Sequence, residues 1–300
     1  MSVPLVLDTD IGSDCDDALA LALAIRHPDV DLRAVTTVSG DTTVRAHLAA
    51  RLLAIAGATD VEVAAGVRVD ADAPNWSGRE GEGVEAGHEA PLSDRSAVDL
   101  LGAIDSGVTI ATVGMQSNIA AAVTRDASII ERTGLLAVMG GSFGPIVSLD
   151  GTEHPPDRDW NLVCDPEGAL DALNAGFETI YVPIDVTFRC PLRRRHVDAL
   201  RGGDDLCRAL AVLVDIWFER TLASAGTSDV VAFLHDPLTV ACVVDRSFVT
   251  IERLPVRCQL IEGVPRTIVD AKGRDADVVR SVDADAFADW WLSVVMGTFS

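Results

Sequence analysis

The chain has 300 residues, of which 48% are hydrophobic and 23% are charged, as is usual for a globular protein. Aspartate and glutamate number 46 against 24 lysines and arginines, which gives a formal net charge of −22. Charge of this sign repels nucleic acids and anionic membrane surfaces, so we expect neither as a partner and expect a small, neutral molecule instead.

Short apolar runs alternate with helical periodicity along almost the whole chain. The predicted strands are residues 3–7, 32–38, 61–65, 108–113, 134–139, 178–184 and 256–261. The predicted helices, in which apolar residues recur every three or four positions, are residues 16–26, 43–56, 97–105, 118–126, 165–175, 206–223 and 285–296. Continuous apolar strands separated by helices predict a mainly parallel β-sheet flanked by helices, which is an open doubly wound α/β fold. We expect residues 1–300 to form a single domain.

The apolar runs, the first residues and the cysteines indicate the cellular compartment of the protein. No apolar run approaches the roughly 20 residues that cross a bilayer, and the first residues lack the pattern of a secretory signal. The six cysteines are scattered, with no pair at the spacing of a zinc site or a redox motif. We therefore expect a cytoplasmic protein with reduced cysteines. Cys15 has no histidine near it in sequence, so we interpret it as a spacer and not as a nucleophile.

The most informative segment begins where the first predicted strand ends. Five carboxylates lie within ten positions, at Asp8, Asp10, Asp14, Asp16 and Asp17. Like charges this close repel one another, so the cluster requires a cation, protonation of some members, or a helix N-terminus beside them. Crowded oxygen ligands suit Ca²⁺ or Mg²⁺, and parallel sheets bind ligands at the carboxyl ends of their strands. The segment therefore predicts a metal site at the first strand-to-helix turn.

An Asp-Thr-Asp sequence after a strand is compatible with three kinds of site. An EF-hand loop needs a glutamate at its twelfth position, which is Leu19 here, so this interpretation fails. A phosphotransferase would use Asp8 as its nucleophile and would need a lysine for the phosphate, but the only lysine, Lys272, lies near the end of the chain. In a metal-dependent hydrolase, one carboxylate both binds the ion and takes a proton from water.

Six segments carry a further indication, at residues 8–21, 34–41, 112–120, 138–144, 159–169 and 233–241. In this order they resemble the sequence signatures of the nucleoside hydrolases of the inosine–uridine-preferring type. The first of these signatures, D-x-D-P-G-x-D-D-A, corresponds to DTDIGSDCDDALAL in this chain. The chain departs from it in two places, because Ile11 replaces the usual proline and two residues are added before Asp16. The resemblance covers most of the chain and implies the fold of that family.

The resemblance also implies an activity, the Ca²⁺-dependent cleavage of a ribonucleoside to the free base and ribose. Ca²⁺ would be held by Asp10, Asp17, Asp236 and the backbone carbonyl of Val113. Asp10 would also be the general base that activates a metal-bound water. His235 would donate a proton to the leaving base, because a histidine titrates near neutral pH.

The same resemblance assigns residues to the sugar and to the base. Asp16, Asp41, Asp159 and Asn161 would contact the ribose hydroxyls. The family often has glutamate in place of Asp159 and asparagine in place of Asp41. Arg79 is the nearest counterpart of a histidine that some relatives place in the loop at 67–93.

Family members are commonly dimers or tetramers, so the resemblance implies a homodimer or a homotetramer. Independently of the resemblance, we expect Asn118 to cap the helix predicted to start there. A non-catalytic protein that binds nucleosides or ribose on the same fold stays open as an alternative, as does a hydrolase of a modified nucleoside. The base preference is left undetermined by the sequence.

Overall fold

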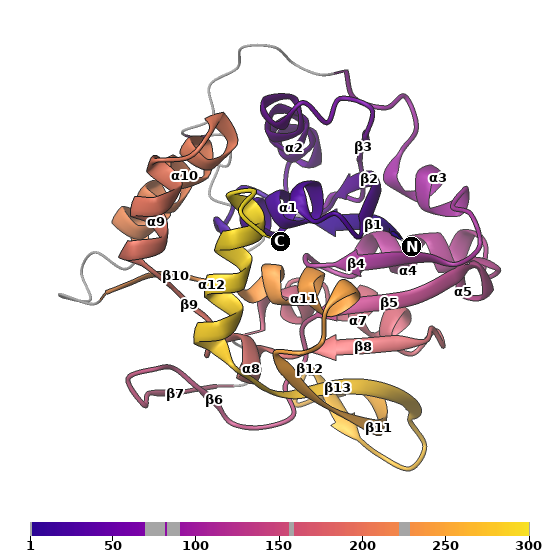
Figure 1. Ribbon diagram of the computed structural model, residues 1–300. Coiled ribbons are helices and arrows are strands. Elements are labelled where there is room, and N and C mark those ends of the chain that lie inside the picture. The colour runs from indigo at the N-terminus through magenta and orange to yellow at the C-terminus, as the bar shows by residue number, and fades with distance from the viewer. Residues whose placement is uncertain (1, 70–81, 83–90, 156–158, 222–228, 300) are drawn as a thin grey trace.

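The computed structural model describes residues 2–69, 82, 91–155, 159–221 and 229–299, and one large sheet runs through them (Figure 1). Its nine strands lie in the order β12-β11-β13-β8-β5-β4-β1-β2-β3. Their bounds are β1 Val3–Thr9, β2 Val30–Thr37, β3 Glu62–Ala65, β4 Val108–Thr112, β5 Thr133–Met139, β8 Thr179–Val182, β11 Val249–Ile261, β12 Val264–Val269 and β13 Arg274–Val282. The strands from β13 to β3 in this order run parallel, whereas β11 is antiparallel to both of its neighbours.

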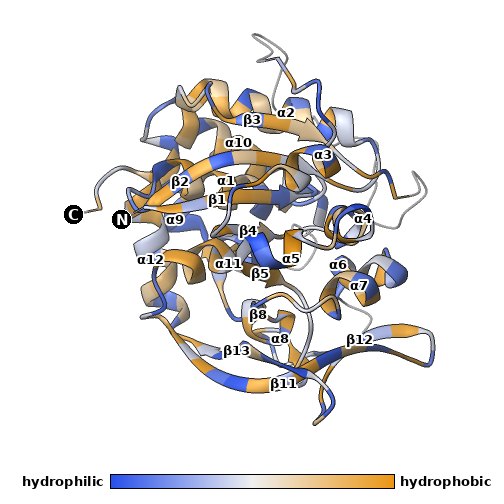
Figure 2. Cartoon of the chain, turned by 90° about the vertical axis from the view of Figure 1, so that its right-hand side faces the viewer, coloured by the Kyte–Doolittle hydropathy of each residue, from blue (hydrophilic) through white to orange (hydrophobic). Residues whose placement is uncertain are grey.

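Helices cover both faces of the sheet, as Figures 1 and 2 show. One face carries α1 Asp16–Arg26, α2 Thr42–Ala56, α10 Asp205–Thr221, α11 His235–Val244 and α12 Ala284–Val295. The other carries α3 Ala97–Gly102, α4 Ser117–Arg125, α5 Ile129–Arg132 and α7 Pro166–Leu173. Alternate residues of β1 serve the two cores, since Leu5 and Leu7 belong to the first and Val6 to the second. A strand buried on both faces is apolar throughout, which is why the continuous apolar runs predicted these strands.

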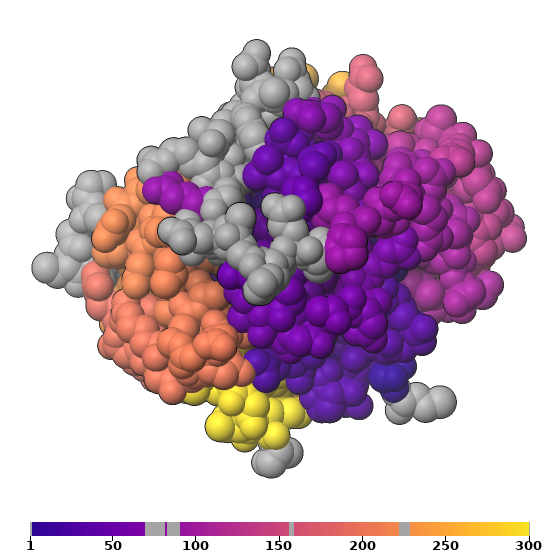
Figure 3. All heavy atoms as spheres, turned by 90° about the horizontal axis from the view of Figure 1, so that it is seen from above, coloured from indigo at the N-terminus to yellow at the C-terminus, as the bar shows by residue number. Residues whose placement is uncertain are grey.

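Shorter elements connect these layers. They are α6 Trp160–Val163, α8 Ile184–Thr187 and α9 Arg194–Arg201, the antiparallel pair β9 Pro191–Arg193 and β10 Val230–Phe233, and the pair β6 Ile146–Val147 and β7 Glu153–His154. Figure 3 shows α10, in orange, beside the N-terminal third of the chain, and α10 contacts α1 and α2 there. Among the described residues, none of the helices is both long enough and apolar enough to cross a membrane.

The predicted parallel strands and most of the predicted helices are present, with bounds that differ by a few residues. The prediction for residues 256–261 is wrong in its direction, because they belong to β11, which forms an antiparallel hairpin with β12. Helices α9 and α11 lie where we predicted none. The strand predicted at 178–184 ends at Val182, because Pro183 lacks the N–H group that would continue the ladder, and α8 begins directly after it.

Candidate active site

The strand order reverses at β1. From β1 the chain returns through α1 to β2 on one side, while β4 lies on the other side. In parallel α/β sheets this arrangement opens a crevice at the carboxyl ends of the two diverging strands. The acidic residues 10–17 follow β1 and Val113 follows β4, so both of these predicted groups lie at the same edge of the sheet.

Residues 10–17, called the acidic turn below, end with the first two residues of α1 and are held by Thr9, the last residue of β1. The Thr9 hydroxyl donates to Asp17 Oδ1 and accepts from the backbone N–H of Ile11 at 3.1 Å. Gly12 has a φ of 109°, a conformation that residues with a side chain rarely adopt, and it allows the turn to reverse. Asp16 and Asp17 then begin α1, where the unpaired N–H groups of the first turn favour negative charge. Sequence reasoning missed Thr9, because a threonine in a buried strand gives no sign of its partner.

Asp16, Asp17 and Asp236 meet at this edge, although Asp236 lies far along the chain. Each offers a carboxylate oxygen, and these oxygens all lie within 4.8 Å of one another. Asp236 is the second residue of α11, which packs against α1. All three residues are at most 5% exposed. The structure thus brings two of the predicted metal ligands together with Asp16, which we had assigned to the sugar.

The electrostatics of these three carboxylates fit a bound cation. Burial raises the pKa of Asp16, Asp17 and Asp236 well above the usual value, and neighbouring carboxylates raise these pKa values further. A cation would oppose both effects, because it supplies attraction in place of the lost hydration and offsets the mutual repulsion. All the donors are oxygens, which Ca²⁺ and Mg²⁺ prefer. The cluster is therefore a candidate site for a hard divalent cation.

Asp10, another predicted ligand, lies against the end of β4. A Cβ atom placed on Gly114 would come within 2.9 Å of Asp10 Oδ1, so glycine at this position leaves room for the carboxylate. Asp10 is not one of the three carboxylates that meet within 4.8 Å. Its charge nevertheless contributes to the raised pKa of both Asp17 and Asp236, which indicates that it lies close to them.

Asn161 lies next to Val113, the residue predicted to offer a carbonyl to the metal. From α6, Asn161 Nδ2 donates to the Val113 carbonyl at 2.7 Å and to the Met139 carbonyl at 3.2 Å. These two bonds tie together the ends of β4 and β5. A carbonyl oxygen has two lone pairs, so the bond from Asn161 leaves one of them for another partner.

Asp8 is fully buried within β1, directly before the acidic turn. Its Oδ1 accepts from Thr36 Oγ1 at 2.6 Å and from Asn118 Nδ2 at 2.7 Å. Burial is the main reason that the pKa of Asp8 is raised to about 7, against the opposing effect of these hydrogen bonds. A carboxylate enclosed in this way cannot reach a phosphoryl group, so the structure gives no support to a phosphotransferase with Asp8 as its nucleophile.

The prediction that Asn118 caps a helix is wrong. The helix α4 begins one residue earlier, at Ser117, and the Asn118 side chain points into the sheet edge instead. Asn118 Nδ2 donates to Asp8 and to the Thr37 carbonyl at 3.0 Å, while its Oδ1 accepts from the backbone N–H of Val67 at 2.8 Å. Asn118 therefore links β1, β2 and the segment that follows β3.

Two of the residues predicted to bind the sugar accept hydrogen bonds from backbone N–H groups. Asp159 is 4% exposed and accepts from the backbone N–H of Gly141, and burial raises the pKa of Asp159 to about 6. Asp41 caps α2, where its Oδ1 accepts from the backbone N–H groups of Thr43 and Val44. Arg79, the predicted counterpart of a loop histidine, lies outside the described part of the chain.

His235, the predicted acid, is the first residue of α11 and precedes Asp236. Its Nδ1 lies 2.7 Å from the hydroxyl of Thr187 at the end of α8. Its ring packs against Phe188 and Phe233, with centroids 5.2 and 5.6 Å away. These contacts fix the plane of the imidazole. Thr187 was not found from the sequence, because nothing there relates it to a histidine so far along the chain.

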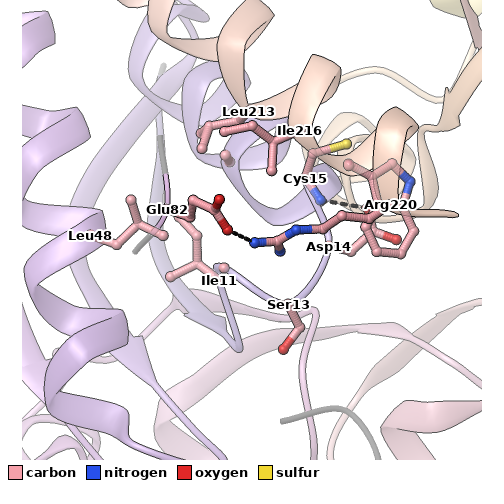
Figure 4. A pocket seen from close by; sticks show the side chains of 12 residues that line it. Ile11, Ser13, Asp14, Cys15, Leu48, Glu82, Leu213, Ile216 and Arg220 are labelled. Carbon is pink, nitrogen blue, oxygen red and sulfur yellow. Dashed lines mark hydrogen bonds and ion pairs between the residues drawn. The ribbon is translucent and has the colours of Figure 1, made fainter. Parts of the chain in front are cut away.

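A cavity lies beside the acidic turn, between α2 and α10 (Figure 4). Its wall includes Ser13, Asp14 and Cys15 from the turn, Leu48 from α2, and Leu213, Ile216, Trp217 and Arg220 from α10. An ion pair joins Glu82 to Arg220 at this cavity. Burial raises the pKa of the Cys15 thiol well above its usual value, so the thiol stays protonated near neutral pH, in agreement with its interpretation as a spacer.

Comparison with known proteins identifies the family. The profile of the family described as inosine-uridine preferring nucleoside hydrolase matches residues 5–289. The pyrimidine-specific ribonucleoside hydrolase RihA of Salmonella newport is 28% identical over 315 aligned residues, which cover 96% of this chain and 97% of that protein. Among solved structures, the plant nucleoside hydrolase PpNRh1 has a TM-score of 0.84 at 24% identity and covers 99% of both chains. The purine-preferring ribonucleoside hydrolase of Gardnerella vaginalis has a TM-score of 0.82 at 24% identity and covers 98% of both chains.

These similarities confirm the predicted fold class and the resemblance drawn from the six segments. The family match extends from the first strand to α12, so it includes the acidic turn, Asn161 and Asp236. The chain belongs to the inosine-uridine preferring nucleoside hydrolase family and is an N-ribosyl hydrolase.

Proposed function

We propose that the protein is a Ca²⁺-dependent hydrolase that cleaves ribonucleosides to the free base and ribose. The observation that carries the proposal is the meeting of Asp16, Asp17 and Asp236 within 4.8 Å, at the sheet edge where ligands of such folds bind. Family membership supplies the reaction class. The donors are oxygens only, which supports Ca²⁺ and leaves Mg²⁺ as the competitor to be tested.

In this proposal, Asp10, Asp17, Asp236 and the Val113 carbonyl hold the ion, which when bound contributes positive charge that acidifies water and attracts substrate oxygens. Asp10 accepts the proton of the attacking water. The water oxygen forms a bond to C1′ of the ribose as the bond from C1′ to the base nitrogen breaks, and the electron pair of that bond leaves with the base. The raised pKa of Asp17 and Asp236 in the ion-free protein supports the need for a cation among these carboxylates.

Other side chains of the proposed site act on the sugar and on the base. Asp16 and Asn161 lie next to the proposed ligands, and the Asp16 carboxylate and Asn161 Oδ1 would accept from ribose hydroxyls. Asp159 and Asp41 are proposed to bind the sugar as well, and Arg79 is proposed to bind the substrate. Carboxylates near C1′ also stabilise the positive charge that develops on the ribosyl group. His235, whose ring plane is fixed by its packing, would deliver a proton to the leaving nitrogen.

The test is the release of reducing sugar from a panel of purine and pyrimidine ribonucleosides by metal-stripped protein. Each is measured with Ca²⁺, with Mg²⁺ and with a chelator. Pyrimidine ribonucleosides come first, because the relative in Salmonella newport is named as specific for them. We expect release with Ca²⁺ and none with the chelator.

Two variants sharpen this test. Asp10→Asn should lower the rate by at least about 100-fold, because it removes the general base. Asp171→Asn is the matched control. It makes the same change of charge at an exposed position on α7, on the opposite face of the sheet. A rate of sugar release that is unchanged by the chelator and by Asp10→Asn would contradict the proposal. Binding of nucleosides in calorimetry without any release of sugar would favour the non-catalytic alternative.

We also propose that the protein works as a homodimer or homotetramer, on the basis of the family resemblance, and that it works in the cytoplasm, where its scattered cysteines would stay reduced. Sedimentation equilibrium of the purified protein measures the number of chains directly. A monomer at micromolar concentration would contradict this part of the proposal without affecting the hydrolase assignment.

A further inference from the structure

Arg45 stands out among the cations of the protein. In the part of the chain that the structure describes, it is the only lysine or arginine with a buried side chain, at 0% exposure. It lies in the first turn of α2, a helix that covers the sheet near β2 and β3. Burial of a guanidinium is costly unless its charge and its donors find partners. The partners of Arg45 therefore indicate what it does.

Four hydrogen bonds join the guanidinium to two loops at the site. Nη1 donates to the backbone carbonyls of Asp10 and Ile11, the latter at 2.9 Å, and Nη2 donates to Ser13 Oγ at 2.8 Å. Nε donates to the carbonyl of Ser39 at 2.9 Å, in the loop after β2. The rigid, planar fork of the arginine thus ties the acidic turn to the neighbouring loop.

Both loops contain a residue in the left-handed backbone region. Gly12 has a φ of 109° and Ser39 a φ of 68°. A serine in this region is strained, and such backbone persists only when its surroundings hold it in place. The Ser39 N–H donates to the Val67 carbonyl at 3.0 Å, and the Ser39 carbonyl accepts from Arg45. Arg45 is therefore one of the contacts that fix the shape of this edge of the sheet.

The charge of Arg45 also acts on the acidic residues. The positive charge of Arg45 attracts the Asp17 carboxylate, whereas the charges of Asp10 and Asp14 repel it. The two properties of Arg45 have opposite consequences for a cation, because its charge repels the ion whereas its hydrogen bonds hold the ligands ready. The sign of the change in affinity on replacing Arg45 therefore shows which property dominates.

We propose that Arg45 is a positioning residue for the metal site. It holds the backbone at Asp10 and Ile11, so that the Asp10 carboxylate is set beside Asp17 and Asp236 before an ion binds. Without it, repulsion among the carboxylates opens the acidic turn in the ion-free protein, and ion binding has to order the turn again. The proposal rests on the proposed function, which places a cation among these carboxylates.

The first test is calorimetric titration of metal-stripped Arg45→Met with Ca²⁺. Methionine keeps an unbranched apolar chain and removes both the donors and the charge. We expect binding about 10- to 100-fold weaker than in the wild type, as is usual when partners that orient metal ligands are lost. Unchanged or tighter binding would overturn the proposal, because it would leave repulsion as the larger effect. Arg51→Met, a half-buried position on the same helix, is the matched control and should bind Ca²⁺ like the wild type.

The kcat at saturating Ca²⁺ distinguishes a positioning role from a merely structural role. Under this condition the kcat of Arg45→Met should return to within about twofold of the wild type, because the bound ion orders the turn. A loss of kcat that Ca²⁺ does not restore would overturn the proposal.

If Arg45→Met does not fold, Arg45→Lys is measured instead, since lysine keeps the charge and cannot reach all four acceptors. Weaker Ca²⁺ binding by Arg45→Lys supports the proposal, and wild-type affinity overturns it.

A final readout separates this proposal from the proposed function. Hydrogen exchange of the backbone amides of residues 11–17 is measured on ion-free wild type, Arg45→Met and Arg51→Met. Faster exchange in Arg45→Met alone supports the positioning role even if the wild type were to bind no Ca²⁺, which would by itself refute only the proposed function. Equal exchange in all three proteins would overturn the positioning role whatever the ion does.

Discussion

Replacing Asp236 by asparagine should have opposite effects on the ion-free and the ion-bound protein. The carboxylate oxygens of Asp16, Asp17 and Asp236 lie within 4.8 Å of one another. Two unit charges at about that separation repel by about 3.5 kcal/mol when the effective dielectric constant is about 20. The raised pKa of Asp236 means that protonation already relieves part of this repulsion. We therefore expect ion-free Asp236→Asn to be more stable than the wild type by roughly 1–3 kcal/mol.

With Ca²⁺ present the order should reverse, because the variant has lost a proposed ligand. An ion at a thousandfold excess over its Kd stabilises the folded wild type by about 4.1 kcal/mol, which exceeds the advantage of the ion-free variant, and the variant should gain far less from the ion. The assay is urea unfolding followed by circular dichroism near neutral pH, with chelator and with Ca²⁺. Asp171→Asn, at an exposed position on α7, should change the free energy of unfolding by no more than about 0.5 kcal/mol in either condition.

Two results would refute this reasoning. If ion-free Asp236→Asn is less stable than the wild type, the three carboxylates do not repel in the folded protein, and the electrostatic argument for a cation fails. If Ca²⁺ stabilises the variant as much as the wild type, the ion binds elsewhere. Either result would remove the support that the cluster of three carboxylates gives to the proposed function.

Three further predictions concern pH, the leaving base and the core. In the ion-free protein, the free energy of unfolding should fall as the pH rises from about 4 to about 7, because folded Asp8 keeps a proton that the unfolded chain releases above a pKa of 3.8. Asp8→Asn should make this slope shallower in urea titrations without removing it, because the pKa values of Asp159 and of the three clustered carboxylates are raised as well. An unchanged slope would assign it entirely to those other groups. His235→Ala should lower kcat about 10²- to 10⁴-fold on ordinary nucleosides. The loss should be far smaller on a riboside of p-nitrophenol, because p-nitrophenolate leaves without needing a proton. Equal losses on both substrates would exclude the role of His235 as an acid. Trp291→Phe removes a buried hydrogen bond of 3.2 Å from Nε1 to the Leu19 carbonyl, so thermal unfolding should show a loss of about 1–3 kcal/mol, with kcat unchanged in the same preparation.

The sequence predicted the parallel part of the sheet because burial on both faces leaves a simple pattern. Strands such as β1 and β5 are apolar over continuous runs, from Val3 to Leu7 and from Leu135 to Met139. The hairpin of β11 and β12 has no such pattern along its whole length. On β11, Glu252 and Arg253 are charged and exposed, and Pro255 interrupts the apolar sequence although the strand continues through it. Its pairing depends on contacts between strands that a single sequence does not reveal.

The candidate site was predictable where its residues are neighbours in sequence. The acidic turn was recognised in the sequence by the number of its carboxylates, whereas Asp236 was assigned only through the resemblance to a family. Arg45 was not predicted, because an arginine in an amphipathic helix usually faces water and its partners are mainly backbone carbonyls. Asn118 was assigned wrongly, because an asparagine at a helix start commonly caps it, but here Asp8 and two backbone groups offer it better partners.

The three carboxylates of the cluster come from distant parts of the chain, and this has a consequence for biosynthesis. The residues of the acidic turn leave the ribosome first, but α11 docks on α1 only after most of the chain has been made. An N-terminal fragment therefore carries a repulsive, incomplete set of ligands, and loop closure over this span is a late and slow step. An ion that binds only the completed set would favour the docked chain over its precursors by mass action. Metal loading would then mark the end of folding, and a truncated chain would remain both unloaded and less stable.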